Sequence, residues 1–361
     1  MSKKLRQQIK EFNKKKKKID SEWYSLRSLI GNDWAMLYFM LGGREAGKSY
    51  ATTKFYVNQY RKYGRPFYWL RLTLDSATKL LKNNAEKLID ADIRRKYNIN
   101  RLETIGECVY EVTKEDEKGK ILEKKLMARV LALSTFYSDK GNAYFDNEFL
   151  NNPDMYYNIC LDEMNREKNE KNSFDIVYAF VNQLENLVRS TKKKVRVICI
   201  GNTLDEASDI LSAIDFIPEE FGRFKIKSKR AIVDYIEPTQ AYLERRKGTI
   251  ADILSPTAST FTNKIESDRS LVLKKRLVRP EYIIKFYKND EMYTLWNDNI
   301  IRAYNGENCP VYPMRPYLDE RFIPEFRDSV IAQFDARSFK FYTLIDYKKF
   351  KKSLEMLKPR K

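Results

Sequence analysis

The sequence contains no histidine among its 361 residues. This absence excludes histidine general bases, serine–histidine triads and histidine-ligated zinc, so proton transfer must use carboxylates, lysine or water. Only four cysteines are present, and their scattered positions lack the spacing of a metal site. We interpret Cys160 and Cys199, which lie in apolar runs, as reduced core residues, which suits a cytoplasmic protein.

Long apolar runs are also missing. No run approaches the roughly 18 residues of a membrane span, and the charged N-terminus has no apolar core behind it, unlike a signal peptide. We therefore expect no membrane partner. Hydrophobic residues nevertheless make up 43% of the chain, so it has enough apolar side chains for a globular protein with two domains.

Positive charge is in large excess. The formal net charge is +18, which predicts an acidic partner, most simply nucleic acid. General solubility charge is the alternative reading. Residues 1–20 are rich in lysine, with five in a row at Lys14–Lys18. We interpret this segment as a basic arm that contacts phosphates or a partner, or as a solvated tail.

One stretch matches a phosphate-binding pattern. Residues 42–49 read Gly-Gly-Arg-Glu-Ala-Gly-Lys-Ser and fit G-x-x-x-x-G-K-[ST]. The apolar run Ala35–Leu41 before it predicts a buried strand, and the run 49–63 after it predicts a helix that Gly64 ends. Strand, loop and helix are the context that this pattern needs, which favours the phosphate loop of an ATP-binding protein.

The chemistry of the loop follows from its residue types. Glycines let backbone N–H groups approach phosphate oxygens, and the helix N-terminus adds a favourable dipole. We expect Lys48 to reach the β- and γ-phosphates and the Ser49 hydroxyl to ligate Mg²⁺. The loop residues predicted to bind the nucleotide are Gly42, Gly43, Arg44, Glu45, Ala46, Gly47, Lys48 and Ser49.

A second apolar run ends in two acids, Asp162 and Glu163. At the end of a strand beside the phosphate loop, Asp162 would hold Mg²⁺ through water, and Glu163 would polarise the attacking water. A further apolar strand, 195–200, is followed by Asn202, which fits a sensor of the γ-phosphate or an asparagine that caps the strand. These three strand ends predict a P-loop ATPase of the additional-strand, catalytic-glutamate type.

The predicted elements divide the chain into three parts. Residues 1–212 form the ATPase domain with its basic arm, 213–258 a small linker or lid subdomain, and 259–361 a second α/β domain. In the first part we also predict a strand at 66–72, a helix at 76–90, a hairpin within 107–133 and a helix at 174–190. In the last part we predict strands at 269–278, 282–288 and 291–298, and helices at 326–334 and 347–357.

This order of elements resembles the genome-packaging ATPase of small, protein-primed tailed bacteriophages, the podophage motors that work with a packaging RNA. The resemblance covers most of the first 250 residues and is thinner afterwards. The matching pieces are residues 42–49, 62–64, 139–144, 161–163 with 166–168, 195–202 and 244–247.

The resemblance implies a homomeric ring, usually a pentamer, that docks transiently on the portal of a prohead in the host cytoplasm. It implies ATP-driven translocation of double-stranded DNA and the use of a packaging RNA. It further implies a C-terminal RNase H-like domain, a vestigial nuclease that binds nucleic acid or the portal. The acids available there, Asp268, Asp290, Glu291 and Asp298, form no convincing metal-binding triad, so we expect no nuclease activity.

Three basic residues take roles from the same resemblance. Arg189 best matches the arginine finger that completes a neighbouring subunit's site, and Lys140 matches a second basic residue that acts across the interface. Arg44 resembles the arginine of terminase phosphate loops that swings towards the γ-phosphate. A contact between Arg189 and DNA phosphate or solvent is the alternative.

Two other functions remain open. One is a different P-loop nucleic-acid-dependent ATPase, such as a helicase or a replication ATPase. The other is a nucleotide-dependent scaffold that does not hydrolyse, although Glu163 argues against it, because a scaffold needs no acid that polarises water.

Overall fold

The structure is a computed structural model, and it describes residues 22–31, 34–139, 156–166, 174–188, 195–202, 208–255, 269–315 and 324–357. The chain forms two compact units. The first contains the described residues up to 202 together with 220–255, and the second contains 208–219 together with 269–357. Among the described residues, no helix is both long and apolar enough to cross a membrane.

The first unit is built on a sheet of nine strands among its described residues, in the order β3-β4-β5-β2-β6-β7-β1-β9-β8. The six strands from β5 to β9 run parallel, and antiparallel strands extend both edges. The strands are β1 (Leu37–Leu41), β2 (Phe67–Arg71), β3 (Arg101–Ile105), β4 (Cys108–Glu115), β5 (Ile121–Ala132), β6 (Tyr157–Asp162), β7 (Val195–Gly201), β8 (Gly222–Ile226) and β9 (Ala231–Tyr235).

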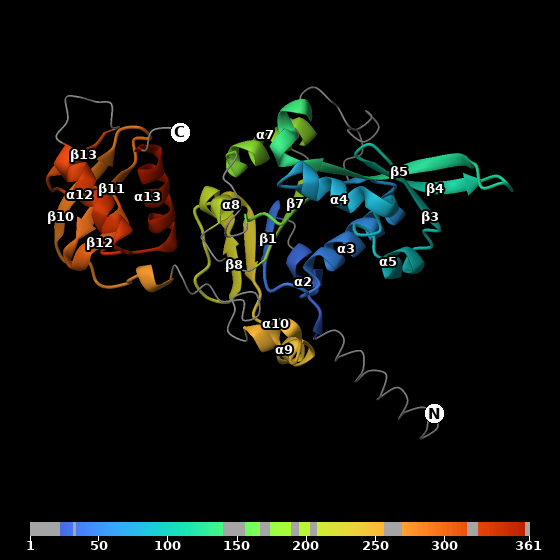
Figure 1. The fold of residues 1–361 in the computed structure, drawn as a ribbon, viewed down its shortest axis with the longest axis horizontal. Coiled ribbons are helices and arrows are strands. Elements are labelled where there is room, and N and C mark those ends of the chain that lie inside the picture. Colours follow the sequence, from blue (N-terminus) through green and yellow to red (C-terminus); the bar gives the residue numbers. More distant parts are fainter. Residues whose placement is uncertain are drawn as a thin grey trace, which may run out of the picture. The chain divides into compact units, whose positions relative to one another are not determined.

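The central strands read as continuous apolar runs because both of their faces are covered. Every residue of β6 and β7 is buried, and four of the five residues of β1 are buried. The predicted strands at these positions are confirmed. In Figure 1 the far ends of β4 and β5 extend as a two-stranded ribbon, which confirms the predicted hairpin.

Helix α3 (Lys48–Tyr63) confirms the helix expected after the phosphate loop. Its buried side includes Tyr56, which donates a hydrogen bond to the Ile159 carbonyl of β6 at 2.7 Å. The helix ends at Gly64, whose φ of 71° favours glycine and whose N–H donates to the Tyr60 carbonyl. The loop that precedes α3 is therefore held between a buried strand and an anchored helix.

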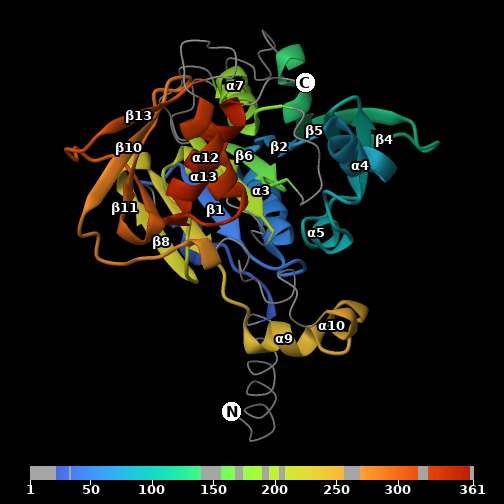
Figure 2. The same cartoon turned by 60° about the vertical axis from the view of Figure 1, so that its left-hand side comes forward.

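Two expectations for this unit differ from the structure. The helix expected at 76–90 is α4 (Leu74–Ala85), whose regular part stops before Lys82, because Lys82 is not helical and Asn83 and Asn84 adopt positive φ values of 52° and 55°. The stretch expected to be a linker or lid (213–258) instead supplies β8 and β9 to the sheet, where β9 pairs with β1. Its remaining helices in this unit are α9 (Gln240–Arg246) and α10 (Ile250–Leu254), which follow one another in Figure 2. Among its described residues, the unit also contains the helices α2 (Arg27–Ile30), α5 (Ala91–Lys96) and α7 (Ile176–Val188).

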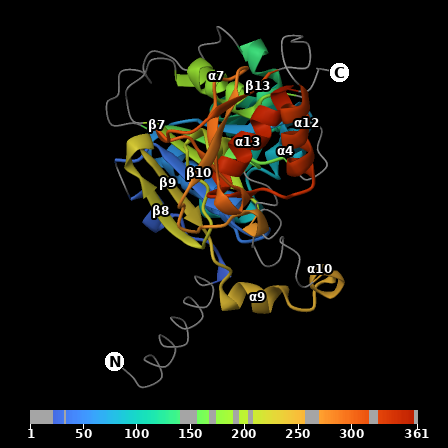
Figure 3. The same ribbon diagram turned by 90° about the vertical axis from the view of Figure 1, so that its left-hand side faces the viewer.

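The second unit is a smaller α/β fold. Its described strands form one sheet in the order β13-β10-β11-β12-β14, in which β10, β11 and β12 are antiparallel and β13 and β14 add in parallel at the two edges. Figure 3 shows α12 and α13 lying side by side. The elements are α8 (Asp209–Ala213), β10 (Pro280–Phe286), β11 (Met292–Trp296), β12 (Ile300–Ala303), β13 (Val311–Met314), α12 (Pro324–Asp335), β14 (Lys340–Phe341) and α13 (Leu344–Leu357).

The strand expected at 269–278 is wrong. Leu271 is buried in a short 3₁₀ turn and Val272 forms an isolated β-bridge with Phe341, but most of the following residues are exposed, so the stretch does not continue as a strand. Helix α8 belongs to this unit as well, because Lys348 of α13 pairs with Asp209 at 3.2 Å. The expected boundaries after residues 212 and 258 therefore differ from the division that the contacts give.

Candidate functional site

The phosphate loop connects β1 to α3, at the carboxyl edge of the parallel strands. Gly47 precedes α3 with a φ of 85°, and a Cβ added there would lie 2.9 Å from Cε3 of Trp23. The Gly42 N–H donates to the Gly201 carbonyl of β7 at 3.3 Å. Glycine is therefore favoured at position 47 for two reasons: it adopts a positive φ without strain, and it leaves room for the ring of Trp23.

Lys48 points into the loop. Its Nζ donates to the carbonyl oxygens of Gly42 and Gly43, both at 2.7 Å, and the residue is buried. Burial lowers the pKa of Lys48 to about 8, although the nearby carboxylate of Asp162 acts in the opposite direction. A desolvated ammonium held by two carbonyls is suited to exchange these bonds for phosphate oxygens.

Asp162 is the last residue of β6 and lies next to α3. The Ser49 hydroxyl donates to its Oδ1 at 3.2 Å, and Arg71 Nη2 lies 3.0 Å from its Oδ2. Burial raises the pKa of Asp162, which the guanidinium of Arg71 partly offsets. The adjacent hydroxyl and carboxylate oxygens fit Mg²⁺, which takes one or two protein oxygens and otherwise keeps water and phosphate ligands.

Glu163 follows β6 with a φ of 59°, which turns its half-exposed side chain away from the strand direction. The carboxylate forms an ion pair with Nη1 of Arg71. Burial lowers the pKa of Arg71, but Asp162 and Glu163 outweigh this effect and raise it above the usual value. One guanidinium therefore bridges both acids that the sequence analysis selected.

Arg71 was not identified from the sequence. It is the last residue of β2, and β2 pairs with β6, so the guanidinium reaches the acids from the neighbouring strand. A single arginine that ends an otherwise apolar run was the available signal. Its significance depends on the strand order, which the sequence alone does not give.

The other predicted site residues are only partly placed. Asn202 follows β7 and is half-buried. Strand β7 lies between β6, which leads to Asp162 and Glu163, and β1, which leads to the phosphate loop, so Asn202 follows a strand that neighbours both. Arg44 is at the exposed tip of the loop. Lys140 and Arg189 lie outside the described residues.

The acids of the second unit are dispersed. Asp290 pairs with Lys285 at 3.3 Å, and Asp298 pairs with Lys275 at 2.7 Å. Asp268 lies outside the described residues. Within the described part of the chain, no three acids, cysteines or histidines come together as a metal-binding group.

A contact from α9 was also missed by sequence reasoning. Helix α9 lies against the phosphate loop, and three of its side chains, Tyr242, Arg245 and Arg246, donate hydrogen bonds to loop carbonyls. Residues 244–247 have no local pattern that predicts a contact with the loop, and only the family resemblance singles them out. The partners are separated by about 200 residues along the chain, so only tertiary structure connects them.

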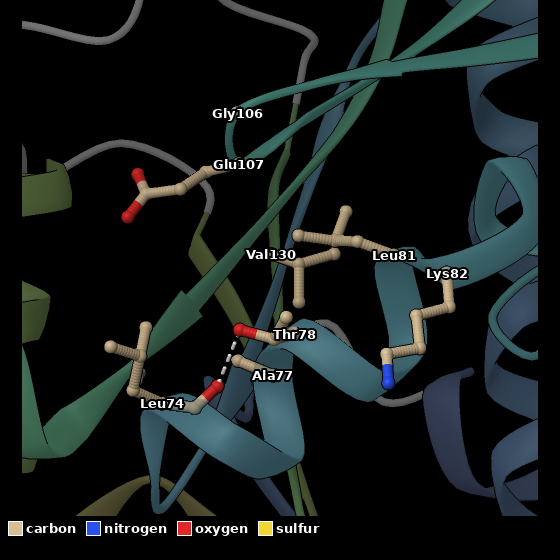
Figure 4. A pocket seen from close by; sticks show the side chains of 9 residues that line it. Leu74, Ala77, Thr78, Leu81, Lys82, Gly106, Glu107 and Val130 are labelled. Carbon is tan, nitrogen blue, oxygen red and sulfur yellow. Dashed lines mark hydrogen bonds between the residues drawn. The ribbon is translucent and has the colours of Figure 1, made fainter.

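A separate hollow of about 350 Å³ lies away from this site. Figure 4 shows Leu74, Ala77 and Leu81 of α4 on one side of it, with Val130 of β5 close by. Its lining contains no residue of the phosphate loop and neither Asp162 nor Glu163. We therefore do not assign the nucleotide to it.

Comparisons with known proteins agree on one family. The family model described as Podovirus DNA encapsidation protein (Gp16) matches residues 19–314. The DNA packaging protein of Bacillus phage phi29 is 23% identical over 282 residues, which cover 77% of this chain and 76% of that protein. The DNA packaging protein of Bacillus phage B103 is 22% identical over 267 residues, covering 73% and 74% respectively.

Two solved structures share the fold. The bacteriophage Phi-29 viral genome packaging motor assembly gives a TM-score of 0.63 at 19% identity, covering 93% of this chain and 100% of that chain. The Phi-28 gp11 DNA packaging motor gives a TM-score of 0.60 at 16% identity, covering 95% and 100%. At these identities the likeness establishes the fold, and the family assignment rests on the family model.

Proposed function

Because the chain belongs to the podovirus DNA encapsidation protein (Gp16) family, we propose that it is the ATP-driven motor that translocates double-stranded viral DNA into a prohead. The observation that carries the proposal is the group formed by Lys48, Ser49, Asp162 and Glu163 at one edge of the parallel sheet. This set supplies a phosphate cation, metal-ligand oxygens and a water-polarising acid, which are the parts that ATP hydrolysis needs.

Each residue of the group has a distinct task. Lys48 leaves the carbonyls of Gly42 and Gly43 and binds the β- and γ-phosphates. Ser49 and Asp162 would hold Mg²⁺, which would neutralise charge on the phosphate oxygens. Glu163 accepts a proton from the attacking water, as a carboxylate must in a chain without histidine.

Arg71 limits when Glu163 can act. Because the carboxylate is paired with Nη1 of Arg71, it must leave this ion pair before it can accept a proton from the attacking water. Asp162 remains a second anchor for Arg71 at 3.0 Å. Glu163 can therefore leave the ion pair without leaving Arg71 buried and unpaired.

The assembly is part of the proposal. The chain works as a homomeric ring, most simply a pentamer, that docks on the prohead portal with a packaging RNA. Arg189 completes the site of the adjacent subunit, with Lys140 nearby, and Arg44 and Asn202 respond to the γ-phosphate. The support is the family membership and the likeness in fold to a packaging motor assembly. The net charge of +18 supports contact with DNA phosphates through the basic arm and the second unit.

The deciding experiment measures ATP hydrolysis and DNA protection from nuclease with purified proheads. We expect proheads to stimulate hydrolysis and DNA to become nuclease-resistant only when ATP is present. Lys48→Ala should abolish both activities. ATP-dependent strand separation without prohead stimulation would instead support the alternative, a helicase or replication ATPase.

A further inference from the structure

Three successive carbonyl groups of the phosphate loop accept hydrogen bonds from outside the loop. The Arg44 carbonyl accepts from the Tyr242 hydroxyl and from Arg246 Nη1, both at 2.8 Å. The Glu45 carbonyl accepts from Arg245 Nη2 at 2.7 Å. The Ala46 carbonyl accepts from the backbone N–H of Tyr24 at 2.9 Å. No carbonyl between residues 44 and 46 is therefore left to rotate freely.

The orientation of each carbonyl determines the orientation of the next N–H group. A trans peptide is planar, and its C=O and N–H bonds point in opposite directions. Fixing the carbonyls of residues 44, 45 and 46 towards these donors therefore turns the N–H groups of Glu45, Ala46 and Gly47 away from them. These three N–H groups donate no hydrogen bond to any part of the chain that the structure describes.

Successive backbone N–H groups that have no partner within the protein can together bind an anion. The positive φ values of Glu45 (62°) and Gly47 (85°) belong to this curved backbone. A loop that already holds this shape loses less conformational entropy when it binds phosphate than a loop that must first fold around it. The α9 side chains thus have a direct physical route to nucleotide affinity.

The donors are themselves held in place. Arg246 is buried and also donates to the Tyr242 hydroxyl at 2.9 Å, so these two side chains form one unit on the Arg44 carbonyl. The guanidinium of Arg245 stacks on the ring of Trp23 at 4.0 Å, and that ring packs against Gly47. The loop is clamped from α9 on one side and from residues 23 and 24 on another.

We propose that Tyr242, Arg245 and Arg246 of α9 are positioning residues that preorganise the phosphate loop and set its affinity for the polyphosphate of the nucleotide. The proposal rests on the proposed nucleotide site at this loop. It assigns the effect of α9 to the phosphates and not to the base. Because the proposed effect of α9 acts through the orientation of the loop peptides, charge is not required for it. A neutral substitution that removes one hydrogen-bond donor must therefore also weaken phosphate binding.

The test uses the full-length protein and inorganic tripolyphosphate, with ADP for comparison, measured by titration calorimetry. Tyr242→Phe removes one hydroxyl without changing charge, and Arg246→Ala removes the second donor. Lys247→Ala is the matched control, because Lys247 is the next residue, loses the same charge, and has an exposed side chain without a hydrogen bond or ion pair to the described residues.

We expect Tyr242→Phe to raise the Kd of tripolyphosphate about threefold to tenfold, in line with one lost hydrogen bond. Arg246→Ala should raise it further, and ADP should weaken by the same factor in each variant. The KM for ATP should rise, whereas kcat should stay within about twofold of the wild-type value. The reason is that the α9 contacts to the loop stabilise the bound substrate and the transition state equally. Lys247→Ala should bind tripolyphosphate like the wild type.

Two outcomes overturn the inference. One is a folded Tyr242→Phe protein that binds tripolyphosphate with wild-type affinity. The other is a weakened affinity for ADP with tripolyphosphate unaffected, which would place the effect of α9 on the base. Lys48→Ala separates this result from the larger proposal: if that variant keeps wild-type tripolyphosphate binding, the loop is not the phosphate site and the proposed function itself fails. If Arg246→Ala does not fold, the neutral Tyr242→Phe variant still decides.

Discussion

Burial makes Lys48 easier to deprotonate than an exposed lysine, with a pKa of about 8 in the free protein. Bound phosphate would raise that pKa, so binding takes up a proton once the free lysine is neutral. The Kd of ADP should therefore rise as the pH increases above about 8, by up to about tenfold per pH unit. Calorimetric titrations between about pH 7 and 9.5 measure this, and a flat profile would contradict it. Lys48→Arg, which stays charged, should lose the pH dependence.

Glu163, which pairs with Arg71, is expected to be needed for ATP hydrolysis and not for ATP binding. Glu163→Gln should bind ATP with an affinity close to that of the wild type, because Glu163 lies outside the loop that holds the phosphates. It should lose at least about a hundredfold in kcat, because an amide cannot accept the proton. Equilibrium binding and steady-state hydrolysis on the same sample check both parts. Hydrolysis at the wild-type rate would refute the assignment of Glu163.

At the scale of single elements, the aromatic core of the second unit depends on α13. Phe350 is fully buried, and its ring contacts Phe286 and Tyr293 with centroids 5.3 and 5.1 Å away. Phe350→Ala should lower the free energy of opening of this unit by about 3–5 kcal/mol. Amide hydrogen exchange of β11 and α13 in the full-length protein measures it. Glu355→Ala, at an exposed position of the same helix, should change it by less than about 0.5 kcal/mol.

The acids of that unit lead to an expected absence of DNA cleavage. Two-metal hydrolysis needs clustered carboxylates, whereas Asp290 and Asp298 each pair with a separate lysine. DNA incubated with the protein and Mg²⁺ or Mn²⁺ should remain intact on a gel. Metal-dependent cutting that disappears in Asp298→Ala or Asp268→Ala would show that the domain is an active nuclease.

Elements buried on both faces were predictable from the sequence, and contacts between distant segments were not. The runs that became β1, β6 and β7 are mostly apolar because both of their faces are covered, and the buried Arg196 and Asn158 are tolerated because they hydrogen-bond to each other at 3.1 Å. The end of α4 depends on two asparagines in a left-handed conformation, which a periodic apolar pattern does not reveal. The stretch 269–278 looked like a strand by composition, although its side chains are mostly exposed.

The candidate site divides in the same way. The loop and its two acids could be found because each is a short local pattern next to an apolar strand. Arg71 and the α9 residues could not, since their importance depends on which strands and helices become neighbours. The residues assigned to the chemistry lie in short sequence patterns, whereas the residues that hold them in place come from distant parts of the chain.

At the scale of the whole molecule, the part of the proposal that an experiment can refute most directly is the coupling between subunits. A ring motor needs a way for one subunit to affect hydrolysis in the next, and Lys48 acts only within its own loop. We predict that Arg189 supplies the missing cation to the adjacent subunit. A cation placed at the γ-phosphate in trans is worth on the order of 10³–10⁵ in rate.

Mixing two inactive variants tests this prediction. Arg189→Ala subunits lack the finger, and Glu163→Gln subunits lack the acid, so each homomeric ring should be inactive. If the finger acts in trans, a mixed ring contains junctions where an intact Glu163 meets an intact Arg189, and part of the ATPase activity returns. If the finger acts in cis, every subunit of a mixed ring still lacks one of the two groups, so activity stays absent even when native mass spectrometry shows that mixed rings have formed. The two geometries therefore give opposite results from the same pair of proteins, with Arg189→Ala mixed with Arg189→Ala/Glu163→Gln as the control that should stay inactive in either case.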